Sequence, residues 1–189
     1  MDHQRFIASR AAKIEASGIR KIFDLAASLE DPINLSIGQP DFDVPAPVKQ
    51  AAIAAIQAGF NRYTPSGGIP ELQQAVLERF ESAQGVRPEE ALITSGVSGA
   101  LTLALQALVN PGELVLMPDP YFVSYKHLTT LCGGIPVYYD TYPDFRVNVA
   151  ALAKLVTPRT KVLLTMSPAN PTRACLDDDK KKAQAILAR

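Results

Sequence analysis

The chain has 189 residues, enough for one ordinary domain or one and a half small ones. Hydrophobic residues make up 47% of the sequence and charged residues 20%, a composition that excludes global disorder. The 19 Lys and Arg residues balance the 19 Asp and Glu residues, and the sequence has no basic cluster with interleaved aromatic residues. Both observations argue against nucleic-acid binding. The two cysteines and two histidines have no spacing typical of a metal site, and they indicate no catalytic triad.

The N-terminal residues 1–10 are polar and lack the apolar stretch of a secretory signal. The longest apolar runs are far shorter than a membrane-spanning helix, so we expect no membrane partner. Cys132 and Cys175 lie far apart in the sequence, which fits a reduced, cytoplasmic location.

The first part of the chain predicts helices separated by irregular segments. Apolar spacing predicts a short helix over residues 19–29, and an extended piece follows over 33–37. The prolines at positions 47 and 70 suit the first turns of two helices, which glycines at positions 59 and 85 end. In the second helix apolar residues recur at helical spacing, which predicts a buried stripe of Leu72, Val76, Phe80 and Ala83.

From residue 91 onward, strands and helices alternate. The predicted strands are Ala91–Thr94, Glu113–Met117, Ile135–Tyr139 and Lys161–Met166. The predicted helices are Gly99–Val109, Tyr121–Leu131 and Asn148–Val156. Such apolar strands, separated by helices, predict an α/β fold whose mainly parallel sheet is covered on both faces, in three αβα layers.

The last segment predicts a solvated helix. Its first turn is acidic and a basic stretch follows, so we expect ion pairs of Asp177 with Lys181 and Asp178 with Lys182, at i,i+4.

The most informative turn lies between the first predicted strand and its helix. A helix that begins in Ser95-Gly96-Val97-Ser98 presents unpaired backbone N–H groups and the positive end of its dipole. Such a turn suits a phosphate group, although a helix start rich in Ser and Gly can also be a simple cap. Four other segments end a strand or begin a helix, where open α/β sheets bind ligands: residues 38–41, 62–68, 119–122 and 167–172.

Six motifs in one order resemble a known family. They are Gly-Gln-Pro-Asp-Phe (38–42), Tyr-Thr-Pro-Ser-Gly-Gly-Ile-Pro-Glu-Leu (63–72), Ile-Thr-Ser-Gly-Val-Ser-Gly-Ala-Leu (93–101), Pro-Gly-Glu-Leu-Val-Leu (111–116), Pro-Tyr-Phe-Val-Ser-Tyr (120–125) and Ser-Pro-Ala-Asn-Pro-Thr (167–172). The series resembles the N-terminal half of the class I/II aminotransferases, which are fold-type-I enzymes dependent on pyridoxal 5′-phosphate (PLP). The resemblance covers about residues 30–175.

The resemblance implies a role for each of seven residues. Gly96, Val97 and Ser98 would hold the cofactor phosphate through backbone N–H groups and the Ser98 hydroxyl. Phe122 would stack on the pyridine ring. Asn170 would donate a hydrogen bond to the phenolic oxygen. Tyr63 would reach the phosphate of a neighbouring subunit's cofactor, which implies a homodimer of the full-length protein, and Gly38 would line the substrate side.

Each of these residues has a simpler interpretation. Phe122 could be a core residue, Tyr63 a packing residue, and Asn170 and Gly38 turn formers.

The resemblance also indicates what this chain lacks. In the family a Schiff-base lysine, an aspartate that pairs with the pyridine nitrogen and an arginine for the substrate carboxylate all follow the Asn-Pro-Thr motif. The sequence ends 19 residues after Asn170, and none of its lysines lies in a matching motif, so we expect no catalytic residue here. Arg173 stands where the family usually has glycine.

The resemblance implies a division into residues 1–45, an N-terminal arm and part of a small domain, and residues 46–189, the first half of the PLP-binding large domain. The implied reaction moves an amino group from an amino acid to a 2-oxo acid, and the chain alone is expected to be inactive. Two alternatives stay open: another fold-type-I enzyme, such as a carbon–sulfur lyase or a ring-forming synthase, and a non-catalytic ligand-sensing domain.

Overall fold

A computed structural model of the chain describes residues 3–14, 22, 25, 29, 30, 33, 38 and 40–187. The chain forms two units, one made of Met1–Ala16 with Ser95–Arg189 and the other of Ser17–Thr94. Most of the helix predicted over 19–29 and most of the extended piece over 33–37 lie outside the described residues.

The larger unit is built on a parallel sheet. Its 3 strands are β1 (Leu114–Asp119), β2 (Ile135–Asp140) and β3 (Thr160–Leu163), in the order β2-β1-β3. Leu114 pairs with Ile135 on one side and with Thr160 on the other, and the register toward β3 shifts after that pair. Successive side chains of a strand point to opposite faces, so an apolar central strand needs cover on both.

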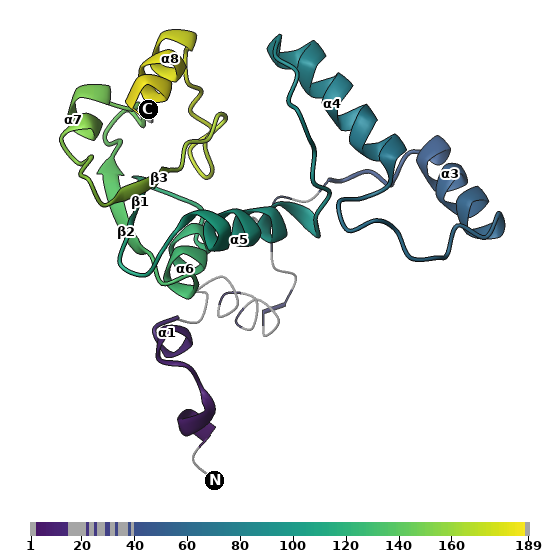
Figure 1. Cartoon of the computed structure of the whole chain (residues 1–189), viewed down its shortest axis with the longest axis horizontal. Coiled ribbons are helices and arrows are strands. Elements are labelled where there is room, and N and C mark those ends of the chain that lie inside the picture. The colour runs from purple at the N-terminus through teal and green to yellow at the C-terminus, as the bar shows by residue number, and fades with distance from the viewer. Residues whose placement is uncertain are drawn as a thin grey trace. The chain divides into compact units, whose positions relative to one another are not determined.

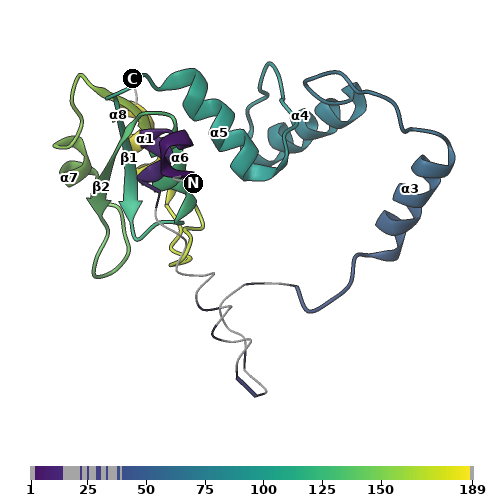
Figure 2. The same cartoon turned by 90° about the horizontal axis from the view of Figure 1, so that it is seen from below.

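Helices supply that cover. On one face α5 (Gly96–Leu108) and α6 (Ser124–Leu131) pack against the sheet, and on the other α7 (Val149–Ala153) and α8 (Asp178–Leu187) do so (Figure 1). Figure 2 shows α6 and α7 on opposite sides of β1 and β2. The predicted three-layer αβα arrangement with a parallel sheet is therefore confirmed.

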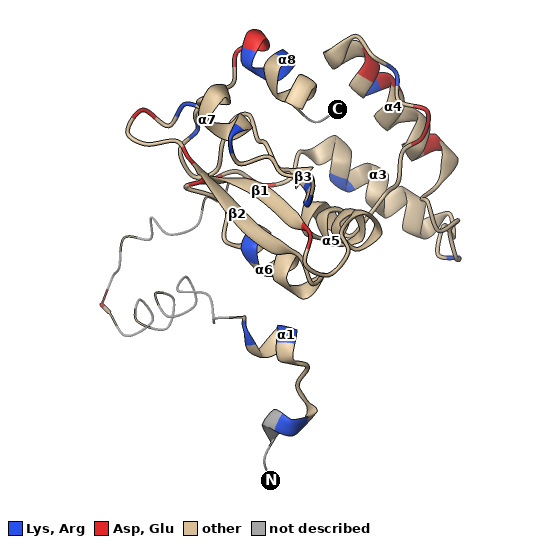
Figure 3. Cartoon of the chain, turned by 60° about the vertical axis from the view of Figure 1, so that its left-hand side comes forward, with Lys and Arg blue, Asp and Glu red and all other residues tan. Residues whose placement is uncertain are grey.

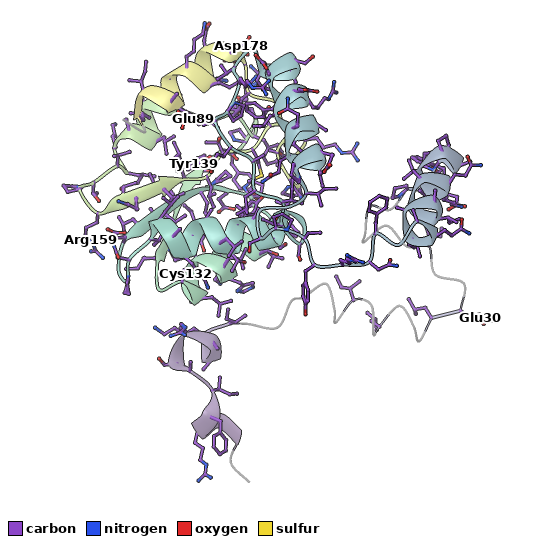
Figure 4. All side chains as sticks on the ribbon, turned by 45° about the vertical axis from the view of Figure 1, so that its right-hand side comes forward. Glu30, Glu89, Cys132, Tyr139, Arg159 and Asp178 are labelled. Carbon is purple, nitrogen blue, oxygen red and sulfur yellow. The ribbon has the colours of Figure 1, made fainter. Side chains whose placement is uncertain are left out.

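The core has one apolar cluster on each face of β1. Val115 and Met117 pack with Leu105 and Val109 of α5, whereas Leu116 packs with Tyr139 and Leu152. Tyr139 lies on β2, within the sheet (Figure 4). The tight Gly133-Gly134 turn lets β2 start beside α5, because a Cβ at Gly134 would come within 2.9 Å of a methyl group of Val109.

One predicted strand is wrong. Ala91–Thr94 does not form a strand of the sheet. The amide of Ile93 donates instead to the carbonyl of Gly67, at 2.9 Å. A strand requires a hydrogen-bonded neighbour along its length, and apolar composition alone does not supply one.

The other predicted elements occur with shifted ends. The helix expected from Gly99 begins three residues earlier, and the one expected from Tyr121 begins at Ser124. The strand expected to reach Met166 ends at Leu163, and Asn148, expected inside a helix, caps α7 by accepting the amide of Ala151 at 3.0 Å.

The acidic and basic residues at the start of α8 pair at a different spacing from the predicted one. Lys180 lies 3.6 Å from Asp177 and Lys181 lies 3.0 Å from Asp178, both at i,i+3 (Figure 3). Asp177 also caps the helix by accepting the amide of Lys180 at 2.8 Å. The predicted i,i+4 pairs are therefore replaced by i,i+3 pairs.

The smaller unit contains α3 (Ala46–Gln57) and α4 (Pro70–Gln84). As expected, Pro47 lies in the first turn of α3, and Pro70 begins α4. The predicted stripe on α4 is present, but Leu72, Val76 and Phe80 are all exposed and no residue of the helix is buried. In the part of the chain that the structure describes, no helix is long and apolar enough to cross a membrane.

Candidate functional site

The candidate site lies at the carboxyl edge of the parallel sheet. β1 ends at Asp119 and leads directly to Phe122, while β3 leads within a few residues to Asn170. In open α/β sheets ligands bind outside the carboxyl ends of the strands. Two of the residues expected to contact a ligand therefore follow strands that are both hydrogen-bonded neighbours in this sheet.

The start of α5 has the features of an anion site. Gly96 adopts φ +71°, and no side chain caps the helix. A Cβ built on Gly96 would meet no heavy atom of the described structure within 4 Å, so the backbone is open there. Because the helix begins at Gly96, the amides of Val97 and Ser98 belong to the first turn, whose N–H groups have no intrahelical acceptors. The exposed Ser98 hydroxyl lies in the same turn.

Phe122 and Asn170 are joined through two intermediate side chains. The rings of Phe122 and Tyr125 meet edge to face, with centroids 5.7 Å apart and planes at 75°. The Tyr125 hydroxyl donates to Sδ of Met166 at 3.9 Å, and the amide of Asn170 donates to the same sulfur at 3.2 Å. The structure thus links the ring of Phe122, predicted to stack on the cofactor, to the backbone of Asn170, whose side-chain amide is the predicted donor.

Two further aromatic residues lie beside this chain of contacts. Tyr121 and Tyr138 stack with centroids 5.1 Å apart and planes at 23°, and their hydroxyls lie 3.5 Å apart. Burial, followed by the hydrogen bond from Tyr121 and the charge of Asp119, raises the pKa of Tyr138 well above its ordinary value. The Tyr138 phenol therefore stays neutral at physiological pH and acts only as a hydrogen-bonding group.

Sequence reasoning missed Tyr121, Tyr125, Tyr138 and Met166. The contact of Tyr125 with Phe122 could have been predicted from the sequence, because the two residues lie one helical turn apart. In the structure the amide of Tyr125 donates to the carbonyl of Phe122 at 3.0 Å. The contact of Met166 with Tyr125 could not have been predicted, because 41 residues separate them along the chain.

The segment that carries Asn170 closes on itself. The amide of Ala169 donates to the carbonyl of Ala174 at 2.8 Å, and the amide of Leu176 donates to the Ser167 hydroxyl at 3.0 Å. Arg173, at the position where the family usually has glycine, adopts φ +59°. The backbone therefore takes the left-handed conformation there, although the side chain disfavours it.

A small cavity adjoins this segment. It holds about 20 Å³, little more than one water molecule, and Pro120, Tyr139, Met166 and Ala169 are among its lining residues. The space is too small for an organic ligand, and neither Phe122 nor Asn170 lines it.

Tyr63 and Gly38 lie in the smaller unit. Tyr63 is fully exposed on the connection between α3 and α4, and Gly38 is exposed as well. Both are accessible to a ligand or another subunit, and their place at the site stays a prediction.

Comparisons with known proteins identify one family. Residues 30–184 match the family described as aminotransferase class I and II. The aspartate aminotransferase of Pyrococcus abyssi is 40% identical over 181 residues, which are 93% of this chain and 46% of that protein. The aromatic-amino-acid aminotransferase 2 of Thermococcus litoralis is 40% identical over 175 residues, 90% of this chain and 45% of that protein.

Solved structures give the same result. An aspartate aminotransferase from Thermus thermophilus with maleate superposes with a TM-score of 0.91 at 36% identity, over 96% of this chain and 50% of that one. This chain spans about half the length of the curated relatives it matches. With its αβα fold and the site motifs in the family's order, the chain belongs to the class I and II aminotransferases.

Proposed function

We propose that this chain carries the cofactor-binding half of a PLP-dependent aminotransferase, which moves an amino group from an amino acid to a 2-oxo acid. The observation that carries the proposal is the linkage of Phe122 to Asn170 at the carboxyl edge of the sheet, in a chain whose α5 begins at the open Gly96. The family is PLP-dependent, and the residues present suit the phosphate, the ring face and the phenolic oxygen of that cofactor.

The phosphate suits the start of α5. The first-turn amides of Gly96, Val97 and Ser98 and the Ser98 hydroxyl are the donors expected for a dianion, and the helix dipole favours negative charge at this end.

The ring suits Phe122 and Asn170. A half-buried ring, held by its edge contact with Tyr125, offers a flat apolar face. The Asn170 side-chain amide has no hydrogen bond within the described part of the chain, and it would donate to the phenolic oxygen. When bound, PLP supplies the electron sink for the negative charge left on the amino acid's Cα after proton removal.

Other parts of the proposal concern the whole protein. Tyr63 would contact the cofactor phosphate of a second subunit in a homodimer, and its full exposure supports such a role. Gly38 would line the substrate side. The functional division at residues 45 and 46 and a cytoplasmic location complete the proposal, and this chain alone would lack transaminase activity.

The test uses pyridoxamine 5′-phosphate, whose amine cannot form a Schiff base with surface lysines. We expect the chain to bind it, as measured by fluorescence titration, and to bind pyridoxamine without phosphate far more weakly. Ser98→Ala removes one hydrogen bond to a charged group and should weaken binding about tenfold. The control Ser82→Ala on exposed α4 should leave affinity unchanged.

Two results would contradict the proposal. Equal affinity for the probes with and without phosphate would remove α5 as the phosphate site. Amino transfer from an amino acid to a 2-oxo acid, catalysed by the chain alone with PLP, would disprove its expected inactivity.

A further inference from the structure

We propose that Tyr125 is a positioning residue that fixes Phe122 and Asn170 relative to each other. The inference rests on the proposed function, because it assigns Tyr125 a task in holding two groups that would contact the cofactor. Tyr125 itself would not touch the cofactor.

The ring of Tyr125 holds Phe122. Tyr125 lies in the first turn of α6, and its partly buried ring packs against the apolar cluster that contains Leu105 and Met117. The Phe122 ring meets it edge to face, with centroids 5.7 Å apart. Phe122 precedes the helix, and its carbonyl accepts from the Tyr125 amide at 3.0 Å, which fixes its backbone but not its side chain. The contact with a core-anchored ring therefore sets the direction of the Phe122 ring.

The hydroxyl of Tyr125 reaches Asn170 through a sulfur atom. Sδ of Met166 accepts from the Tyr125 hydroxyl at 3.9 Å and from the Asn170 amide at 3.2 Å. Thioether sulfur is a weak acceptor on a flexible side chain, so a second donor restricts where it can lie. When the hydroxyl holds the sulfur, the sulfur holds the backbone of Asn170.

The two halves of the Tyr125 side chain therefore have separable tasks. Tyr125→Phe keeps the ring contact with Phe122 and removes the contact with Met166. Tyr125→Leu removes both. Met166→Leu removes the shared acceptor from the other side and should reproduce the effect of Tyr125→Phe on Asn170.

The first experiment needs no cofactor. In two-dimensional NMR spectra of the isotope-labelled chain, Tyr125→Phe should shift the backbone amide of Asn170 and the terminal methyl group of Met166. The exposed Tyr142→Phe serves as the control and should move neither signal. If the Asn170 amide keeps its position in Tyr125→Phe while the rest of the spectrum stays native, the proposal is overturned.

The second experiment reads the contact expected between Asn170 and the phenolic oxygen. With pyridoxamine 5′-phosphate bound, the pH at which its ring hydroxyl ionises is followed by absorbance. Tyr125→Phe should raise that pH and weaken binding about threefold, the loss expected for one weak neutral hydrogen bond. The double variant with Met166→Leu should be no worse than either single variant, because the two act through one contact.

The outcomes separate the two proposals. If the unaltered chain does not bind the probe, the proposed function fails while the NMR shifts still decide the link from Tyr125 to Asn170. If the chain binds the probe and the Tyr125→Phe and Met166→Leu variants both leave its ionisation unchanged, the positioning role is wrong and the proposed function stands.

Discussion

The phenol of Tyr139 on β2 donates a hydrogen bond to the carbonyl of Leu164, the residue directly after β3, at 3.0 Å. β1 lies between these two strands, so this side chain spans the central strand and ties its neighbours together. Tyr139 is only 4% exposed, and burial raises the pKa of its hydroxyl far above the ordinary value. The hydroxyl is thus a permanent donor at this end of the sheet.

Tyr139→Phe should destabilise the chain. The variant leaves the partly buried Leu164 carbonyl without this donor, and such a loss costs about 1 kcal/mol in the free energy of unfolding. Urea denaturation followed by circular dichroism measures the effect. Tyr142→Phe, at an exposed position, is the matched control and should change the midpoint little. An unaltered midpoint in Tyr139→Phe would show that water replaces the donor without cost.

Arg173→Gly should stabilise the chain. Arg173 adopts φ +59°, a conformation that costs a residue with a side chain about 1 kcal/mol relative to glycine. We expect a higher urea midpoint for the variant. Ala174→Gly, next to it and without a positive φ, should lower the midpoint because glycine there only adds freedom to the unfolded chain. A lower midpoint in both variants would mean that the Arg173 side chain makes a compensating contact.

Gln184→Leu should also stabilise the chain. Gln184 of α8 is 4% exposed, and its Nε2 has no hydrogen-bond partner in the described structure. A buried polar group left unsatisfied costs about 1–3 kcal/mol, and leucine fills a similar volume without that cost. The same substitution at the exposed Gln57 of α3 should have little effect. A drop in the midpoint of Gln184→Leu would indicate that the amide is satisfied.

Asp177 should make stability depend on pH. The amide of Lys180 donates to the Asp177 carboxylate and holds its pKa below the ordinary value of 3.8. A lowered pKa in the folded state stabilises the fold above the pKa of the unfolded chain, and that contribution disappears as pH falls through the folded value.

Asp177→Asn tests this dependence because its amide oxygen can still cap α8 but does not ionise. The difference in urea midpoint between the unaltered chain and Asp177→Asn should be constant near neutral pH and shrink below pH 3.8. Glu89→Gln, an exposed change whose carboxylate makes no ion pair among the described residues, should give no such trend. A difference that does not vary with pH would refute the assignment.

Much of the fold follows from local sequence patterns. Each strand of the sheet was predicted, since apolar runs such as Glu113–Met117 are bounded by turn residues. Ala91–Thr94 had the same pattern but does not form a strand, because strand formation depends on a partner, which no local pattern reveals.

The roles of Phe122 and Asn170 were inferred from the family resemblance of their motifs, and they stay predictions. The contacts that join them, through Tyr125 and Met166, are tertiary and come only from the folded chain.

The burial of β1 has a consequence for how the sheet unit loses its structure. Val115 and Met117 belong to the cluster on one face, and Leu116 to the cluster on the other. A polar substitution at any of these positions therefore damages one layer directly and displaces the strand on which the other layer rests. The two layers cannot melt separately, so the sheet unit behaves as a single cooperative element, and neither Val115, Leu116 nor Met117 tolerates a polar side chain.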